Sequence, residues 1–336
     1  MKNLNKKIAV VGATGAVGRV FLELLEKNFS GTKDLYLLAS KKSEGKLISC
    51  GDQQFEVQNL STFDFSSVDI AFFSAGAEIS GEFAPKALSQ GCTVIDNSSK
   101  FRRQEDIPLI IPEVNGDILK QINDPIIISN PNCSTAQLLV ALKPIHDLFE
   151  ITRVDVVTFQ AVSGSGQNAI NELLNQTKKS LNNENTENEV YGAQIAFNVI
   201  PAGNLEGNNY TDEEMKISYE TKKILDEKIN VSATSVRVPV IHGHSIAAHV
   251  KTNKKINLPN LNKAFETQTG LDKYSEKDFL SPNPLEHAEG KDPVSVGRIR
   301  ADLWEDDRVN LWIVADNLRK GAALNSLQIM EKILEK

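Results

Sequence analysis

The stretch Ile8-Ala-Val-Val-Gly12-Ala-Thr-Gly15-Ala-Val-Gly18 lies close to the amino terminus and decides the fold class. Its first four residues have the composition of a buried strand, and Ala16 to Asn28 has the apolar spacing of an amphipathic helix. Glycines at such a junction let the backbone approach a pyrophosphate, and the helix start offers free amides and a positive dipole end. The spacing is G-x-x-G-x-x-G, not the commoner G-x-G-x-x-G, so a tight turn without a ligand remains an alternative.

The first 130 residues continue to alternate short apolar runs with amphipathic segments. Apolar runs without clean alternation are typical of a parallel sheet that is covered on both faces. The sequence therefore predicts a doubly wound, Rossmann-like domain. The further strands are expected at Leu35 to Ala39, 68–74, Thr93 to Asp96, 109–111 and 126–129, with a helix at 78–90.

The end of the second strand, near Ala39, indicates which nicotinamide cofactor is used. An Asp or Glu there would accept hydrogen bonds from the ribose hydroxyls of NAD. The sequence instead has Ser40-Lys41-Lys42-Ser43, whose hydroxyls and cations suit a 2′-phosphate. This favours NADP, with a solvated basic turn as the alternative.

The pattern changes from about Arg153 onward. Residues 153–159 and 235–240 alternate as strands with one solvated face, while 181–190 and 258–284 have the composition of loops. An amphipathic helix at 322–334 is expected to return to the first domain. We therefore predict an α/β protein with a cofactor domain (1–130 with 316–336) and an α+β catalytic and dimerisation domain with a mixed sheet (131–315).

Composition excludes several classes of function. The chain has 336 residues, a net charge of −7 and 40% hydrophobic residues, so nucleic acid and anionic membranes are not expected as main partners. Three cysteines without C-x-x-C spacing predict neither a disulfide framework nor a metal site. There is no apolar run of the length of a signal peptide or a membrane span. We expect a cytoplasmic enzyme.

Cys133 is the candidate nucleophile. It follows the apolar run 126–128 and precedes a helical pattern, so it is expected at a helix amino terminus, where the dipole favours the thiolate. The amides there are also candidates for holding an oxyanion. A structural cysteine is the alternative. Cys50 and Cys92 lack such a setting and are expected to be inert.

A base for this thiol is sought among the five histidines. His146 lies on the helix that follows Cys133, and His287 lies in a loop-rich region. His242 and His244, at the end of the strand that contains Arg237, are better candidates because a loop can direct a side chain into a cleft. If both lay on a strand, they would face the same side.

Together these segments resemble the aspartate-semialdehyde dehydrogenase family along nearly the whole chain. Each segment is modest evidence, but nine of them in the family's order make a specific match. They are 12–18, Ser40 to Ser43, Asp96-Asn-Ser-Ser-Lys-Phe-Arg102, Pro112-Glu-Val-Asn115, Ser129 to Thr135, Phe159-Gln-Ala-Val-Ser-Gly164, Glu213-Glu-Met-Lys216, Arg237 to Ser245 and Asp316-Asn-Leu-Arg-Lys-Gly321.

The resemblance implies a role for each matching residue. Cys133 would form the acyl thioester, Gln160 would orient the substrate and His244 would be the general acid/base. Arg237 would bind the α-carboxylate, Glu213 the ammonium, and Arg102 with Lys216 the phosphate. The implied cofactor contacts are Gly12, Thr14, Gly15, Ala16, Val17, Ser40, Lys42, Ser43, Ser163, Gly164 and Asn317.

The implied reaction is the NADPH-dependent reductive dephosphorylation of 4-phospho-L-aspartate to aspartate 4-semialdehyde, in a homodimer or a dimer of dimers. The reaction belongs to the pathway to lysine, threonine, methionine and diaminopimelate. Two features depart from the pattern: Lys42 stands where many members have Arg, and His242 adds a second imidazole. The alternatives are a reductase of N-acetylglutamyl phosphate, a malonyl-thioester reductase and a non-catalytic paralogue on the same scaffold.

Overall fold

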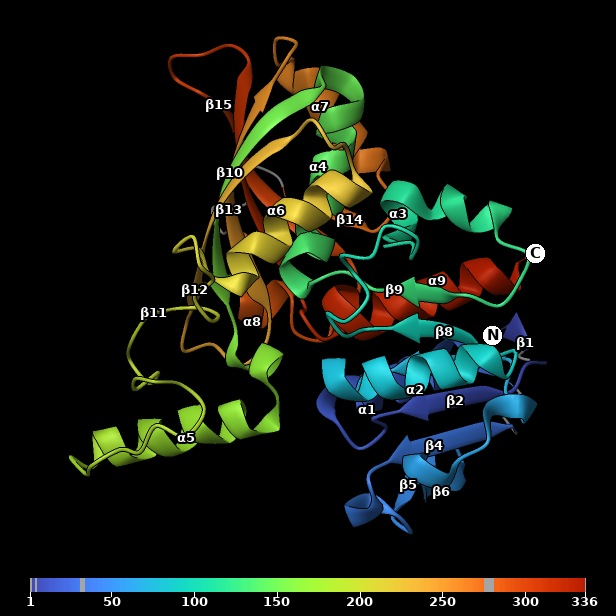
Figure 1. Ribbon diagram of the computed structural model, residues 1–336. Helices are drawn as coiled ribbons and strands as arrows, with labels where there is room; N and C mark the ends of the chain where they lie inside the picture. The colour runs from blue at the N-terminus through green and yellow to red at the C-terminus, as the bar shows by residue number, and fades with distance from the viewer. Residues whose placement is uncertain (1, 4, 31–33, 275–280, 336) are drawn as a thin grey trace. The chain divides into compact units, whose positions relative to one another are not determined.

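The computed structural model describes residues 2–3, 5–30, 34–274 and 281–335. The chain divides into two compact units, Met1–Pro131 with Ala322–Lys336, and Asn132–Gly321. In Figure 1 the first unit comprises the blue and cyan segments and the red carboxyl-terminal helix.

The first unit is built on a sheet of seven strands in the order β5-β6-β4-β2-β7-β8-β9. All neighbours are parallel except β5 and β6, which form an antiparallel edge. Without β5, this is the Rossmann strand order, with the crossover point between β2 and β7. The strands are β1 (Lys2–Asn3), β2 (Ile8–Val11), β3 (Phe29–Ser30), β4 (Leu35–Ala39), β5 (Leu47–Cys50), β6 (Gln53–Asn59), β7 (Ile70–Phe73), β8 (Thr93–Asp96) and β9 (Ile127–Ser129).

Alternate residues of β2 supply the cores on the two faces of this sheet. Ile8 and Val10 belong to the core that includes helices α1 and α9, whereas Ala9 and Val11 belong to the core that includes α2. Because both faces are covered, the central strands β2 and β7 consist of apolar residues alone, which explains the continuous apolar runs at these positions. The helices of this unit are α1 (Ala16–Asn28), α2 (Ala77–Ser89), α3 (Pro112–Asn115) and α9 (Leu324–Leu334).

The second unit contains a mixed sheet in the order β11-β12-β10-β13-β16-β15-β14. Helix α4 contacts β10, β13, β15 and β16, and it also contacts α6 and α7. The elements are α4 (Cys133–Phe149), β10 (Ile151–Gln160), α5 (Gln167–Leu181), β11 (Ile200–Pro201), α6 (Asp212–Ile224), β12 (Asn230–Arg237), β13 (His244–Thr252), α7 (Leu258–Thr267), β14 (Leu271–Lys273), α8 (Pro284–His287), β15 (Val294–Ala301) and β16 (Arg308–Ala315). The predicted fold class is confirmed.

Three predicted segments differ from the structure. At 109–111 only Leu109 forms a bridge, to Ser129, because the Asn115 side chain bonds Ile111 N and Leu109 O. The strand predicted at 235–240 ends at Arg237, since Pro239 cannot donate to a ladder.

The segment 258–284 was predicted to be a loop, yet it contains α7 and β14. Asn257 caps α7, with Asn257 Oδ1 3.0 Å from Asn260 N, and Pro259 lies in the first turn. The Asn and Pro residues that indicated a loop are therefore helix-start signals. Residues 275–280 lie outside the described part of the chain. The antiparallel pair β5 and β6 had not been predicted.

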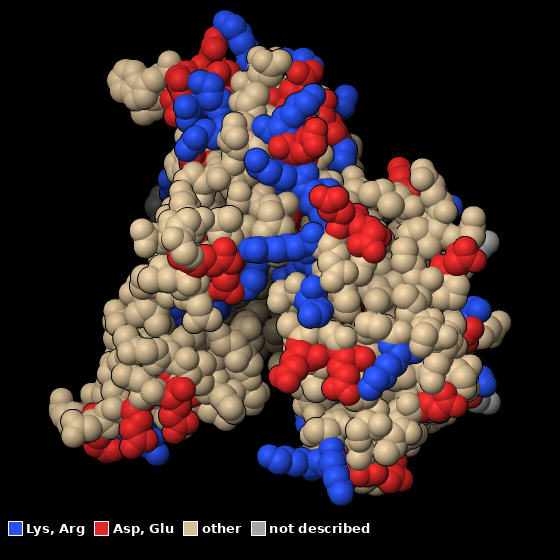
Figure 2. All heavy atoms as spheres, viewed as in Figure 1, with Lys and Arg blue, Asp and Glu red and all other residues tan. Residues whose placement is uncertain are grey.

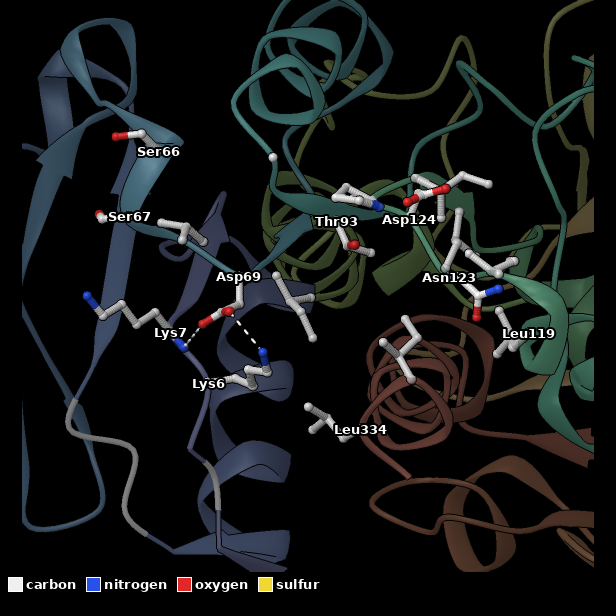
Figure 3. A pocket seen from close by; sticks show the side chains of 18 residues that line it. Lys6, Lys7, Ser66, Ser67, Asp69, Thr93, Leu119, Asn123, Asp124 and Leu334 are labelled. Atoms are coloured by element: carbon white, nitrogen blue, oxygen red, sulfur yellow. Dashed lines mark hydrogen bonds and ion pairs between the residues drawn. The ribbon is translucent and has the colours of Figure 1, made fainter. Parts of the chain in front are cut away.

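The first unit also contains a cavity of about 720 Å³, drawn in Figure 3. Its lining includes Lys7, Asp69 and Thr93, which lie at the amino ends of β2, β7 and β8. The glycine loop follows the opposite, carboxyl end of β2. This cavity therefore plays no part in the candidate site.

The surface carries both signs of charge. On the face shown in Figure 2, Lys and Arg side chains are interspersed with Asp and Glu. Within the described residues, no helix combines the length and the apolar character that spanning a membrane requires.

Candidate active site

Strand register brings three predicted side chains to one edge of the second sheet. Gln160 ends β10, Arg237 ends the parallel neighbour β12, and the two residues pair in register. The antiparallel neighbour β13 begins at His244, and its next residue, Ser245, pairs with Phe159. Three side chains far apart in the sequence therefore converge because two strands end where a third begins.

Cys133 is the first residue of α4, as predicted. Asn132 caps the helix, with its Oδ1 accepting from Ser134 N at 3.0 Å and Thr135 N at 3.4 Å. The Sγ of Cys133 lies 3.2 Å from Nε2 of His244. Asn132 therefore already accepts from the Ser134 and Thr135 amides, and the expectation that the amides of this helix start hold an oxyanion stays a prediction.

His244 is fully buried and its neutral form is favoured. Burial, followed by the charge of Arg237, holds the pKa of His244 well below its ordinary value. Ala161 N–H donates to Nδ1 at 2.9 Å, so the proton of the neutral ring lies on Nε2. That Nε2–H faces the Cys133 sulfur, where it stabilises a thiolate.

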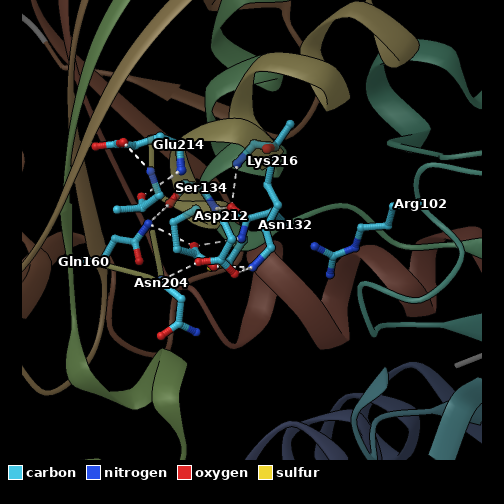
Figure 4. Close-up of polar contacts among 12 residues, drawn as sticks. Arg102, Asn132, Ser134, Gln160, Asn204, Asp212, Glu214 and Lys216 are labelled. Atoms are coloured by element: carbon cyan, nitrogen blue, oxygen red, sulfur yellow. Dashed lines mark hydrogen bonds and ion pairs between the residues drawn. The ribbon is translucent and has the colours of Figure 1, made fainter. Parts of the chain in front are cut away.

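A network of polar side chains surrounds the helix start (Figure 4). Glu213 Oε2 accepts from Asn132 Nδ2 at 3.1 Å and from Gln160 Nε2 at 3.3 Å, while its Oε1 accepts from Lys216 Nζ at 2.7 Å. Lys216 also bonds Asp212 at 2.7 Å. Glu213 therefore links the substrate-binding candidates to the residue before the candidate nucleophile.

The opposite charges of this network stabilise one another. Burial alone would raise the pKa of Glu213, but Lys216, with Arg237 and Asn132, holds that pKa below its ordinary value. Burial acts to lower the pKa of Lys216, but Glu213 and Asp212 raise it. Both groups are therefore charged near neutral pH. Glu213 lies in an acidic run, which usually indicates a solvated face, yet only 15% of its side chain is exposed.

Arg237 is buried beside the histidine. Its Nη1 donates to Ala161 O at 2.8 Å. A Cβ atom on Gly164 would lie 3.3 Å from Arg237 Nη1 and 3.5 Å from His244 Nε2. A residue at position 164 without a side chain leaves room for both groups.

Two predicted cofactor residues contact each other directly. Asn317 Nδ2 donates to Ser163 Oγ at 2.9 Å, and Asn317 Oδ1 accepts from Gly243 N at 2.9 Å. Asn317 therefore anchors the turn that precedes His244. Both polar side chains are buried.

The glycine loop of the first unit has the shape of a phosphate cradle. Gly12 has φ +86°, and a Cβ atom there would lie 2.4 Å from Ser74 O, at the crossover point between β2 and β7. A Cβ on Gly18 would lie 2.3 Å from Gly12 O. The cap of α1 is Gly15, which has no side chain to occupy the amides of 16–18. These features fit a pyrophosphate.

The remaining cofactor and phosphate candidates also lie in the first unit. Ser40, Lys41 and Lys42 are exposed directly after β4, which neighbours β2. Arg102 is 6% exposed, and its Nε donates to Asn130 O at 2.8 Å.

The other histidines do not share the position of His244. His242 precedes β13 instead of lying on it, so the condition under which both rings would face the same side of a strand is not met. Its Nε2 lies 4.0 Å from Glu289 Oε1. His146 lies thirteen residues after Cys133 on α4, about 20 Å along the axis.

Three residues of the site were not predicted. Asn132 caps the helix, and an Asn directly before a helical pattern is a signal that could have identified it. Glu220 is fully buried and accepts from Asn132 N at 2.7 Å; it lies two turns after Glu213 on α6. Tyr191 contacts Arg237 from a loop, and no sequence signal indicates this contact.

Comparisons with known proteins agree with this geometry. Residues 7–122 match the semialdehyde dehydrogenase NAD binding domain, and 142–320 match the semialdehyde dehydrogenase dimerisation domain. The chain belongs to the aspartate-semialdehyde dehydrogenase family. The predicted family is therefore confirmed, and the NAD binding domain indicates a nicotinamide cofactor.

Individual members of the family resemble the chain along almost its whole length. Aspartate-semialdehyde dehydrogenase of Legionella pneumophila is 47% identical over 96% of this chain and 94% of its own. The crystal structure of the Vibrio cholerae enzyme II complexed with ASA has a TM-score of 0.96 and 45% identity, covering 99% of both chains. The Candida albicans enzyme with NADP has a TM-score of 0.74 and 26% identity, covering 98% of both.

Proposed function

We propose that this family member catalyses the reductive dephosphorylation of 4-phospho-L-aspartate to L-aspartate 4-semialdehyde, with NADPH as the reductant. The observation that carries the proposal is the 3.2 Å contact between Cys133 Sγ and His244 Nε2 at the start of α4. A non-catalytic paralogue would have no reason to keep this pair. The relatives at 47% identity are named aspartate-semialdehyde dehydrogenases. Their names favour an aspartate substrate over N-acetylglutamyl phosphate.

The covalent step takes place at Cys133. The thiolate attacks the acyl carbon, a carbon–sulfur bond forms, and the bond to the phosphate oxygen breaks as phosphate leaves with the electron pair. When bound, NADPH supplies the hydride that reduces the thioester. The thiohemiacetal oxyanion then collapses, releasing the aldehyde and regenerating the Cys133 thiolate.

The predicted general acid/base, His244, is proposed to act on this sulfur as a hydrogen-bond donor in its neutral form. With Nδ1 bonded to Ala161 N–H, the ring presents Nε2–H as a hydrogen-bond donor, first to the thiolate and then to the oxygen of the intermediate. A second proton at Nδ1 requires that the Ala161 bond break. The low pKa of His244 keeps the ring neutral at physiological pH.

The surrounding charges match the groups of the substrate. Arg237 is proposed to bind the α-carboxylate and Glu213 the ammonium, with Gln160 orienting the acyl group. Lys216 is proposed to bind the phosphate, and Arg102 stays a predicted phosphate ligand. The buried network among Glu213, Gln160 and Asn132 holds the Glu213 and Gln160 side chains in place before substrate arrives.

NADP is the proposed cofactor. The glycine cradle, with Thr14, Ala16 and Val17, would hold the pyrophosphate. Ser40, Lys42 and Ser43 would bind a 2′-phosphate, and Lys42 would do so as a point charge instead of a bidentate guanidinium. Ser163, Gly164 and Asn317 are proposed contacts from the second unit.

The assembly is proposed to be a homodimer or a dimer of dimers. The dimerisation-domain match to residues 142–320 supports pairing through the second unit. We assign cofactor binding to the first unit, which the NAD binding domain match to residues 7–122 supports, and catalysis to the second unit, which contains Cys133 and His244. A cytoplasmic location remains a prediction.

Trapping the acyl enzyme tests the proposed function. The enzyme would be mixed with 4-phospho-L-aspartate without NADPH, quenched in acid and digested for mass spectrometry. We expect an aspartyl thioester on the peptide that contains Cys133, and no adduct on Cys50 or Cys92. An adduct at another residue, or turnover without a thioester, would contradict the mechanism.

A further inference from the structure

Tyr191 lies against the guanidinium of Arg237, the residue proposed to bind the α-carboxylate. The Arg237 Cζ lies 5.8 Å from the centroid of the Tyr191 ring, within the range of a cation–π contact. In the described part of the chain, the Tyr191 hydroxyl and the Arg237 Nε are both buried without a hydrogen-bond partner. Two residues in contact therefore each have a buried donor without an acceptor.

The loop that carries Tyr191 is fixed to α5. Glu172, itself buried, accepts from Glu189 N at 2.7 Å, Val190 N at 2.6 Å and Tyr191 N at 3.4 Å. Gln176 accepts from Ile195 N at 2.9 Å. These bonds use side chains from the interior of the unit, so the position of the Tyr191 ring is built into the fold.

The other contacts of Arg237 leave its Nε available to donate a hydrogen bond. Nη1 is bonded to Ala161 O, and Gly164 lies close to the same nitrogen. The Tyr191 ring limits how the guanidinium can rotate, since a guanidinium prefers to stay over the aromatic ring. An incoming carboxylate would accept from the donors that remain, because a buried donor without a partner is costly.

We propose that Tyr191 is a specificity-determining residue for the α-carboxylate of the substrate. Its ring positions Arg237, and its hydroxyl donates a second hydrogen bond to the carboxylate that Arg237 binds. This inference rests on the proposed function, because it takes the aspartate α-carboxylate as the ligand of Arg237.

The test compares two aldehydes that differ only in this carboxylate, L-aspartate 4-semialdehyde and 3-aminopropanal. The variant Tyr191→Phe removes the hydroxyl, and Tyr191→Leu also removes the ring. With aspartate semialdehyde, phosphate and NADP, we expect Tyr191→Phe to raise KM about tenfold, and Tyr191→Leu by more, with little change in kcat. For 3-aminopropanal, kcat/KM should stay within about twofold in Tyr191→Phe.

Two controls separate this role from a structural one. Tyr210→Phe removes a hydroxyl from a tyrosine that is 43% exposed, and it should leave both substrates unaffected. Iodoacetamide should alkylate Cys133 of Tyr191→Phe at the wild-type rate. Equal losses for both aldehydes, or an unchanged KM, would overturn the role of Tyr191. A wild-type enzyme inactive with aspartate semialdehyde would instead overturn the proposed function, and this inference with it.

Discussion

The Cys133 site in the second unit and the thiols of Cys50 and Cys92 in the first unit differ in what surrounds the sulfur. Cys133 begins a helix, is partly exposed and has His244 Nε2 at 3.2 Å. Cys50 and Cys92 are buried, and their Sγ atoms contact backbone carbonyl oxygens of Leu22 and Thr93. A carbonyl accepts from a thiol, whereas an Nε2–H donates to a thiolate.

The electrostatics follow from these partners. Burial, with the nearby charge of Glu26, raises the pKa of Cys50 to about 11, and burial with Asp69 raises that of Cys92 to about 12. The thiols of Cys50 and Cys92 are therefore held protonated, whereas the Cys133 sulfur faces a hydrogen-bond donor, His244 Nε2–H. The comparison shows that the surroundings of a cysteine, not its presence, distinguish a candidate nucleophile from an inert thiol.

The largest expected effect is the loss of activity in Cys133→Ser. A serine hydroxyl is a far weaker nucleophile than a thiolate, and His244 in its Nε2–H form cannot take the hydroxyl proton. We expect kcat/KM to fall by at least about 10⁴-fold, measured with aspartate semialdehyde, phosphate and NADP. Cys50→Ser provides the matched control and should stay within a few-fold of wild type. Near-normal activity of Cys133→Ser would contradict the proposal that Cys133 is the nucleophile.

The second effect concerns reactivity. At pH 7, iodoacetamide should alkylate Cys133 at least about 100-fold faster than Cys50 or Cys92, because only Cys133 combines exposure with a donor that stabilises its thiolate. His244→Ala should slow the reaction at Cys133 about tenfold, since one hydrogen bond to a charged group is lost. Peptide mapping over time gives all three rates in one experiment. Similar rates at the three thiols would show that the surroundings do not discriminate between them.

The same contrast explains how much the sequence could predict. The glycine loop, α1, β4 and β8 were predicted with their bounds, because buried strands and helix-start residues leave local signals. Cys133 was placed at a helix start for the same reason. Local patterns failed where a side chain replaced a strand partner, as Asn115 does for Leu109 and Ile111.

The functional contacts within the second unit depend on distant residues. Nothing near position 244 indicates that Ala161 N–H will fix the tautomer of its ring, and nothing near 191 indicates a contact with Arg237. These contacts follow from strand register and from a loop held by Glu172. The family resemblance supplied candidate residues, whereas the structure supplied their partners.

The smallest expected effect is on stability at alkaline pH. The Cys92 thiol ionises near 9.0 when unfolded but near 12 when folded, so the folded state keeps a proton that the unfolded state loses. Its contribution is therefore complete below pH 9 and is lost as pH rises toward 12. Between pH 8.5 and 10, Cys92→Ala should lose about 1 kcal/mol less of its free energy of unfolding than wild type does, measured by urea denaturation.

Val94→Ala removes buried volume from the same core without a titrating group, and should keep the wild-type pH dependence. If Cys92→Ala and wild type lose the same free energy over this range, then the Cys92 thiol is not held protonated by its surroundings, and the contrast with Cys133 rests on exposure and the histidine alone.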